Sequence, residues 1–205
     1  MPSGDVPPLR PSLRAYEAGL SRILGVDPGM GSTGFGIIEL AGSGSFQHRE
    51  SGIIRPRSPH TSQRIQQIFR GLIRLIEQFQ PERMAVERPF CGKNVKSAML
   101  LGQARGAAIL AAAETGVEVQ EYSPLEVKQA VVGYGRAAKE QIEAMVRTLL
   151  GHPQKLNSHA ADALAVALCL AHQLPWHSLI ARAGDGRLGG RSGGGKENPT
   201  PGENP

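Results

Sequence analysis

The sequence of 205 residues has little cysteine, few aromatic side chains and no long apolar run. Its two cysteines, Cys91 and Cys169, form no CxxC pair, so the sequence indicates no disulfide framework. No apolar stretch reaches the length of a membrane span, and the N-terminus has no signal-peptide hydrophobic core. We therefore expect a soluble, cytoplasmic protein that makes no membrane contact, with Cys169 as a small apolar residue on a buried helix face.

The positive charge of the chain lies in its middle. The formal net charge is +5, whereas residues 1–20 and residues 185–205 are each neutral. The first of these segments holds four prolines and the second is rich in Gly, Pro and Ser, so we expect both to be disordered around one folded domain at residues 21–180. A basic body favours a polyanionic partner, commonly nucleic acid, although an ordinary solvated surface accounts equally well for the charge.

The hydrophobic periodicity predicts three short strands first and then an alternation of helices and strands. This order indicates an α/β fold whose sheet mixes antiparallel and parallel pairing. Gly102 and Gly106 share one face of a helix, where each costs about 1 kcal/mol relative to Ala, so we expect another element to approach closely there. The expected strands are residues 22–27, 33–40, 47–54, 83–87 and 117–122, and the expected helices are 61–79, 97–115, one capped by Ser123 with Glu126, 137–150 and 158–172.

Two acidic residues end buried strands. Asp27 follows the apolar run Ile-Leu-Gly-Val and precedes a Pro-Gly turn, so its carboxylate points into the crevice beyond the strand or merely caps that turn. Glu87 ends the strand Met-Ala-Val, a position that needs a partner because Glu has poor strand propensity. That partner is either a shared ligand with Asp27 or a salt bridge to Arg83 or Arg88.

A histidine and a third acid open an almost wholly apolar helix. His159 and Asp162 are three positions apart and therefore share a helix face. An ionised Asp is rarely buried without a counter-charge, so its place on this helix indicates a ligand, the alternative being the helix dipole alone. Three acids and a histidine from separate segments suit a divalent metal site, and on a basic chain they predict a metal-dependent nuclease. Two ions about 4 Å apart can activate water and stabilise the leaving 3′-oxygen of a phosphodiester.

The chain resembles the RuvC family of bacterial Holliday-junction resolvases, within the ribonuclease-H-like superfamily. The matching segments occur in the family's order over about residues 21–175. The resemblance implies a ribonuclease-H-like fold with a mixed five-stranded sheet flanked by helices, and a symmetric homodimer that nicks four-way DNA junctions in pairs with Mg²⁺ or Mn²⁺. It also implies RuvA and RuvB branch-migration proteins as partners. The matches are residues 23–29 (ILGVDPG), 101–106 (LGQARG), 127–133 (VKQAVVG), 145–150 (MVRTLL) and 160–165 (AADALA).

The resemblance assigns roles residue by residue. Asp27, Glu87 and Asp162 match three of the family's four acidic ligands, and His159 stands where the fourth is often Asp. Imidazole suits Mn²⁺ better than Mg²⁺, so we expect stronger Mn²⁺ activity, and a rate that falls when His159 is protonated. The expected DNA contacts, each otherwise a core aromatic or a solvated lysine, are Phe90, Lys93, Lys96, Lys128 and Lys139.

Three other functions compete with this prediction. An ATP-binding protein of the actin and sugar-kinase type also places an Asp-Gly turn at phosphates, but it needs two such domains and a second turn that this chain lacks. A non-catalytic DNA-binding module with this fold would have no need of acids in three separate segments. Another nuclease on the same fold is the third alternative, and the segments around Lys128 and Lys139 favour RuvC over it.

Overall fold

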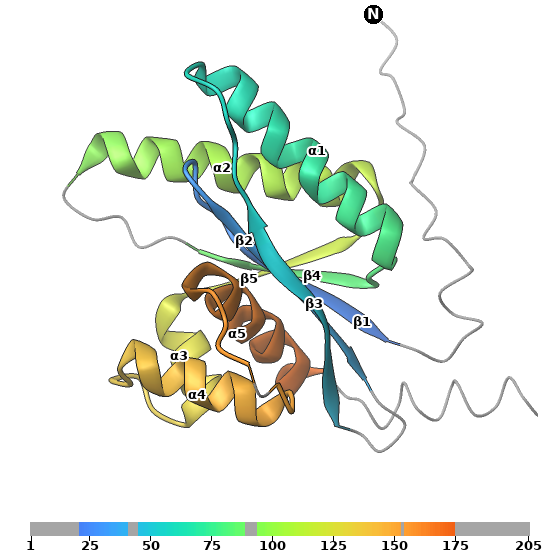
Figure 1. The fold of residues 1–205 in the computed structure, drawn as a ribbon, viewed down its shortest axis with the longest axis vertical. Coiled ribbons are helices and arrows are strands. Elements are labelled where there is room, and N and C mark those ends of the chain that lie inside the picture. Colours follow the sequence, from blue (N-terminus) through green and yellow to red (C-terminus); the bar gives the residue numbers. More distant parts are fainter. Residues whose placement is uncertain (1–20, 41–44, 89–93, 153, 175–205) are drawn as a thin grey trace, which may run out of the picture.

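The chain folds into three layers, a central mixed sheet with helices on both faces (Figure 1). The computed structural model describes residues 21–40, 45–88, 94–152 and 154–174. The expected tails, residues 1–20 and 185–205, lie outside the described residues. The elements are β1 (Arg22–Asp27), β2 (Thr33–Leu40), β3 (Phe46–Ile54), α1 (Thr61–Phe79), β4 (Arg83–Glu87), α2 (Val95–Glu114), β5 (Glu118–Tyr122), α3 (Pro124–Val132), α4 (Lys139–Leu149) and α5 (Ser158–Gln173).

The sheet has the strand order β3-β2-β1-β4-β5, which puts β1 at its centre. β1, β2 and β3 form an antiparallel meander, whereas β4 and β5 run parallel to β1 and to each other. Val26 of β1 pairs with Val86 of β4, so the two acids that follow, Asp27 and Glu87, lie at the same edge of the sheet on neighbouring strands. The predicted mixed five-stranded α/β fold is confirmed.

Alternate residues of the strands build two separate cores. Leu24, Val26 and Met84 face α1 and α2, and Ile23 and Ala85 face α3, α4 and α5. This alternation is the period of two that a strand with both faces covered must show. Since Leu24 and Val26 point to the first side, the odd-numbered positions of β1, including its last residue, belong to the face that α5 covers.

Helix α5 packs unusually close to β1 and β2 because glycines face it. A Cβ on Gly25 would overlap the carbonyl oxygen of Ala163 and lie 2.9 Å from the Cβ of Ala167. A Cβ on Gly34 would overlap the carbonyl oxygen of His159. Side chains on these strand positions would therefore push the helix away, and their absence brings the first turn of α5 to the end of β1.

The predicted elements are all present, with differences of one or two residues at their ends. α2 starts at Val95 because the Asn94 side chain accepts a hydrogen bond from Ser97 N at 3.1 Å and caps the helix two residues earlier than expected. The Ser123–Glu126 capping box of α3 is confirmed. β3 starts one residue earlier, β5 one later, α4 two later, and α5 ends one residue later than expected.

The expectation for Gly102 and Gly106 was wrong within this chain. A Cβ at either position would meet nothing within 4 Å in the described part of the protein. Cys169 is fully buried in α5, as expected. None of the helices in the described ranges is both long and apolar enough to cross a membrane.

Candidate metal centre

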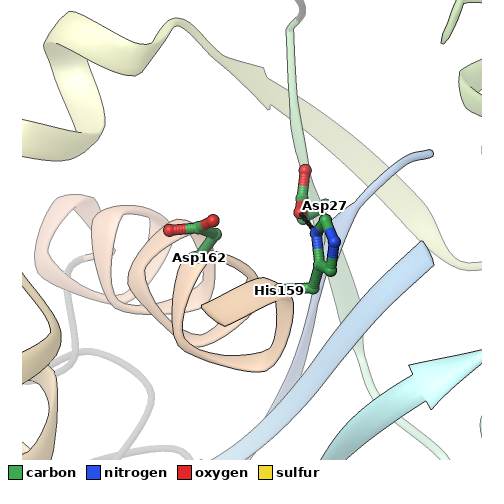
Figure 2. Close-up of side chains that lie close together, drawn as sticks. All are labelled: Asp27, His159 and Asp162. Atoms are coloured by element: carbon green, nitrogen blue, oxygen red, sulfur yellow. Dashed lines mark hydrogen bonds and ion pairs between the residues drawn. The ribbon is translucent and has the colours of Figure 1, made fainter. Parts of the chain in front are cut away.

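Two segments 132 positions apart bring three metal-ligating side chains together. Asp27 at the end of β1, and His159 and Asp162 in the first turns of α5, each offer a ligand atom within 4.8 Å of the other two. His159 Nδ1 lies 2.9 Å from Asp27 Oδ2. Figure 2 shows the His159 imidazole beside the Asp27 carboxylate. Asp162 projects from the helix that carries His159. Two carboxylates and one imidazole form a donor set that fits Mg²⁺ or Mn²⁺.

The start of α5 fixes the position of the histidine. The Asn157 side chain accepts a hydrogen bond from His159 N at 3.0 Å, so the N-cap defines where the first turn begins. The Asp27 side chain is 17 % exposed and that of His159 is 46 % exposed, so a ligand can reach both. The Pro-Gly turn after Asp27 is closed by Thr33 instead, whose hydroxyl donates to the Gly29 carbonyl at 2.9 Å. Asp27 is therefore available to the cluster.

Glu87 stands beside this cluster and forms no ion pair with a described residue, although the charge of Lys139 opposes the rise in its pKa. The two predicted salt-bridge partners are engaged elsewhere, Arg83 with Glu118 and Arg88 with Glu126, each at 3.3 Å. Burial, followed by the charge of Asp27, raises the pKa of Glu87 to about 7. The pKa of Asp27 is also raised by burial, against the opposing effect of its hydrogen bond with His159. Carboxylates crowded in this way bind a cation readily, because the cation removes their mutual repulsion.

Two lysines lie beside the acids, Lys128 on α3 and Lys139 on α4. Lys139, the first residue of α4, places Nζ 2.6 Å from Asp162 Oδ2. Its partial burial opposes ionisation, but the hydrogen bond and charge of Asp162 outweigh that effect and raise the pKa of Lys139. Lys128 Nζ donates to the Ala137 carbonyl at 3.0 Å. A cavity of about 230 Å³ lies between Glu87, Asp162 and the two lysines.

Of the three remaining predicted DNA contacts, the described part of the chain includes Lys96. Phe90 and Lys93 lie outside the described residues. Lys96 is an exposed residue in the first turn of α2, and no contact described in the structure joins it to the acids. The sequence reasoning also missed two features: the direct pairing of Lys139 with Asp162, and Arg64 of α1, whose guanidinium lies over the turn that follows Asp27. No spacing rule in the sequence indicates either one.

The fold and the cluster define a class of protein, an α/β domain that gathers two carboxylates and an imidazole, a donor set able to hold a metal ion, at the edge of its central strands. The model of the family described as crossover junction endodeoxyribonuclease RuvC matches residues 23–170. The chain belongs to the RuvC family, and the predicted ribonuclease-H-like fold is confirmed with it.

Curated relatives and solved structures agree with this membership. A crossover junction endodeoxyribonuclease RuvC from Geobacter sulfurreducens is 47 % identical over 160 residues, which are 78 % of this chain and 97 % of that protein. Another from Shewanella sp. is 49 % identical over 162 residues, 79 % of this chain and 92 % of that protein. The structure of T. thermophilus RuvC in complex with Holliday junction substrate matches with a TM-score of 0.68 and 35 % identity, over 80 % of this chain and 96 % of that one.

Proposed function

We propose that this chain is an endonuclease that resolves Holliday junctions by paired, symmetric nicks during recombination and DNA repair. The observation that carries the proposal is the cluster of Asp27, His159 and Asp162 at one edge of the sheet, in a chain of the RuvC family. A solved relative binds a Holliday junction substrate with the same architecture. The folded nuclease domain spans residues 21–180, and its place of action is the cytoplasm, where it meets cellular DNA.

The metal ligands in this proposal are Asp27, Glu87, His159 and Asp162. They would hold two divalent ions, Mg²⁺ or Mn²⁺, with Asp27 as the bridging ligand because it lies between Glu87 on the neighbouring strand and His159 on α5. Bound ions would supply Lewis acidity for activating water and for stabilising the leaving 3′-oxygen. The crowding that raises the pKa of Glu87 to about 7 favours such cations, since ionisation of Glu87 beside Asp27 is otherwise costly.

The protein's own groups orient the reacting strand. Lys139 holds the Asp162 carboxylate through a charge-assisted hydrogen bond and presents an ammonium group to the cavity beside the acids. Lys128 lies at the same cavity, with one N–H donated to the Ala137 carbonyl and two left for a phosphate. These lysines neutralise the phosphates next to the scissile bond. Phe90, Lys93 and Lys96 extend the contact, with Phe90 stacking on a base near the crossover.

A homodimer completes the proposal, and α2 supplies its interface. Five positions of α2 at helical spacing form one exposed face that nothing in the described chain covers: Val95, Met99, Gly102, Gly106 and Leu110. The three apolar side chains are 70 %, 64 % and 56 % exposed, although a soluble monomer normally buries such a row. The two glycines would let the backbone of a second α2 approach closely. Two-fold pairing of this face gives two active sites for two strands of a junction.

RuvA and RuvB branch-migration proteins are proposed as further partners on the family resemblance. This interaction is tested by mixing the three proteins on one synthetic junction. The measurement is whether cleavage of the junction depends on its migration.

Cleavage of a synthetic mobile four-way junction beside a linear duplex tests the proposed activity. With Mg²⁺ or Mn²⁺ the parent should cut the junction into paired nicked duplexes, while Asp27→Asn should bind the junction without cutting it. Equal cutting of the linear duplex would favour another nuclease on this fold. Cutting by Asp27→Asn would remove the metal centre from the mechanism, and ATP-dependent thermal stabilisation would revive the kinase-like alternative.

A further inference from the structure

We propose that Arg64 and the turn at residues 29–32 form a second phosphate-binding subsite, on the opposite flank of the metal centre from Lys128 and Lys139. Its ligand is a backbone phosphate of the DNA strand that crosses the acids. This inference rests on the proposed function, because it gives the same site a further contact.

The first observation is the state of the Arg64 side chain. Its Nε atom is buried and donates no hydrogen bond to any described residue, and no ion pair joins its guanidinium to one. A guanidinium carries five donors in a planar fork. A buried donor without a partner is costly, so such groups are normally satisfied by protein, water or ligand. A phosphate is the anion whose geometry this fork matches in a bidentate manner.

The second observation is where the fork lies. Arg64 Nη2 is 3.9 Å from the position that a Cβ on Gly31 would occupy, so the guanidinium covers the turn only four residues after Asp27. The Thr33 hydroxyl bonds both the carbonyl and the N–H of Gly29 and holds that turn in place. Gly31 itself is exposed and has no other neighbour within 4 Å of that position. The side chain therefore stands at an open surface next to the metal centre rather than inside the core.

The third observation is the charge of the surrounding chain. Residues 55–64 contain three arginines and no acidic residue, and the first turn of α1 also lacks an acid. Ile54, the last residue of β3, pairs with Thr33, which directly follows the turn. Arg55 therefore lies at the same end of the sheet as the turn. No acidic residue in this segment offsets its positive charge, which is expected for a surface that binds phosphates.

The two flanks lie on opposite faces of the sheet. α1, which carries Arg64, packs on one face, and α3 and α4, which carry Lys128 and Lys139, pack on the other (Figure 1). Asp27 ends the central strand between them. A DNA strand laid over this edge meets Lys139 on one side of the acids and Arg64 on the other. Arg64 thus fixes the strand's direction across the site by holding a phosphate away from the scissile one.

The test compares Arg64→Gln with Arg74→Gln in the full chain. Arg74 is exposed on the same helix ten residues later, about 15 Å along the axis, so its replacement removes the same charge away from the turn. Binding of a synthetic four-way junction is measured in Ca²⁺ between 50 and 300 mM NaCl. We expect Arg64→Gln to weaken binding about tenfold and to lower the log–log salt slope by about one, and Arg74→Gln to leave the slope nearly unchanged.

Melting temperature separates this role from a structural one. Because no described residue accepts a hydrogen bond from Arg64 Nε, Arg64→Gln loses no contact within the described fold and should melt at or above the temperature of the parent. Arg64→Lys should recover charge but not the fork, and so restore only part of the binding. An unchanged slope, an equal loss in Arg74→Gln, or a lower melting temperature that accompanies the binding loss would overturn the subsite. If instead the parent fails to cut junctions, the proposed function fails, whatever Arg64 does.

Discussion

Lys139 Nζ lies 2.6 Å from Asp162 Oδ2, so a lysine from α4 and a candidate metal ligand from α5 form a direct ion pair. A cation held by Asp162 would compete with the ammonium group for this carboxylate. Lys139 also lines the cavity beside Glu87 and Lys128, so a displaced ammonium group would stay at that cavity. We therefore expect occupation of the proposed metal site to change the position of Lys139.

Replacing Lys139 with Met should separate metal binding from catalysis. Affinity for Mn²⁺, measured by calorimetry, should stay equal or rise, because the ammonium no longer competes for Asp162. The single-turnover rate of junction cleavage should fall by about 10²-fold, since a charged donor at the reacting phosphate is lost. Lys139→Arg, which keeps the charge, serves as the control. A loss of Mn²⁺ affinity in Lys139→Met would contradict this division of roles.

Replacing His159 with Asp should change the preferred metal. The variant exchanges imidazole for a harder oxygen ligand while Asp27 and Asp162 remain, so the ratio of the cleavage rate in Mn²⁺ to that in Mg²⁺ should fall several-fold. Rates are measured at saturating junction with each metal titrated separately. The same ratio in parent and variant would show that His159 does not contact the ions.

Glu87 should make the metal-free protein less stable as pH rises. Burial raises the pKa of Glu87 from 4.5 to about 7, so the folded state binds its proton more tightly than the unfolded chain does. Stability therefore falls between about pH 4.5 and pH 7, by an amount on the order of 2–3 kcal/mol. Urea unfolding in EDTA at pH 5 and pH 7.5 measures this change, and Glu87→Gln should lack it. Equal pH dependence in both proteins would refute the assignment.

Gly25→Ala should destabilise the fold through the contact between β1 and α5. The added Cβ overlaps the Ala163 carbonyl oxygen and lies 2.9 Å from Ala167, so the helix must move, at a cost of about 1–3 kcal/mol. Denaturant unfolding gives this value. Because α5 carries two of the candidate ligands, Mn²⁺ affinity should fall as well. A free energy of unfolding equal to that of the parent would contradict the close contact of Gly25 with α5.

Met99→Glu should convert the proposed dimer to a monomer. A carboxylate in the exposed apolar face of α2 would be desolvated in a two-fold pair and would face its own copy. Sedimentation measures the mass, and a junction held in a supercoiled plasmid shows whether the two nicks remain paired. Leu125→Glu, which is 55 % exposed on α3, should leave the mass unchanged. A monomeric parent would contradict the dimer itself.

The sequence was sufficient for the sheet and for the elements that carry the cluster. The short apolar run of β1 before its Gly-rich turn, the helical spacing of α1 and the Ser123 capping box are local signals, so each element could be placed within two residues. The convergence of Asp27, His159 and Asp162 was expected from their places at a strand end and a helix start, and from the family resemblance, but the direct contact between Asp27 and His159 was not predicted. It depends on Gly25 and Gly34, whose importance comes from a helix that meets them from far away in the chain.

Features that depend on distant side chains could not be predicted in the same way. The pairing of Lys139 with Asp162 joins two helices, and the position of Arg64 over Gly31 depends on how α1 crosses the sheet. The prediction for Gly102 and Gly106 failed because it was based on a local signal alone. Helix propensity indicated that these glycines allow a close approach, but nothing in the described part of this chain lies within 4 Å of a Cβ at either position.

The bare glycines beneath α5 have a practical meaning for protein design. Since backbone rests on backbone at Gly25 and Gly34, the separation between the helix and the strand end does not depend on the side chain at position 159. The residue at position 159 can therefore be replaced without moving α5 relative to the end of β1. We expect one substitution at this position to alter the metal preference of the proposed site while the spacing between α5 and the end of β1 is kept.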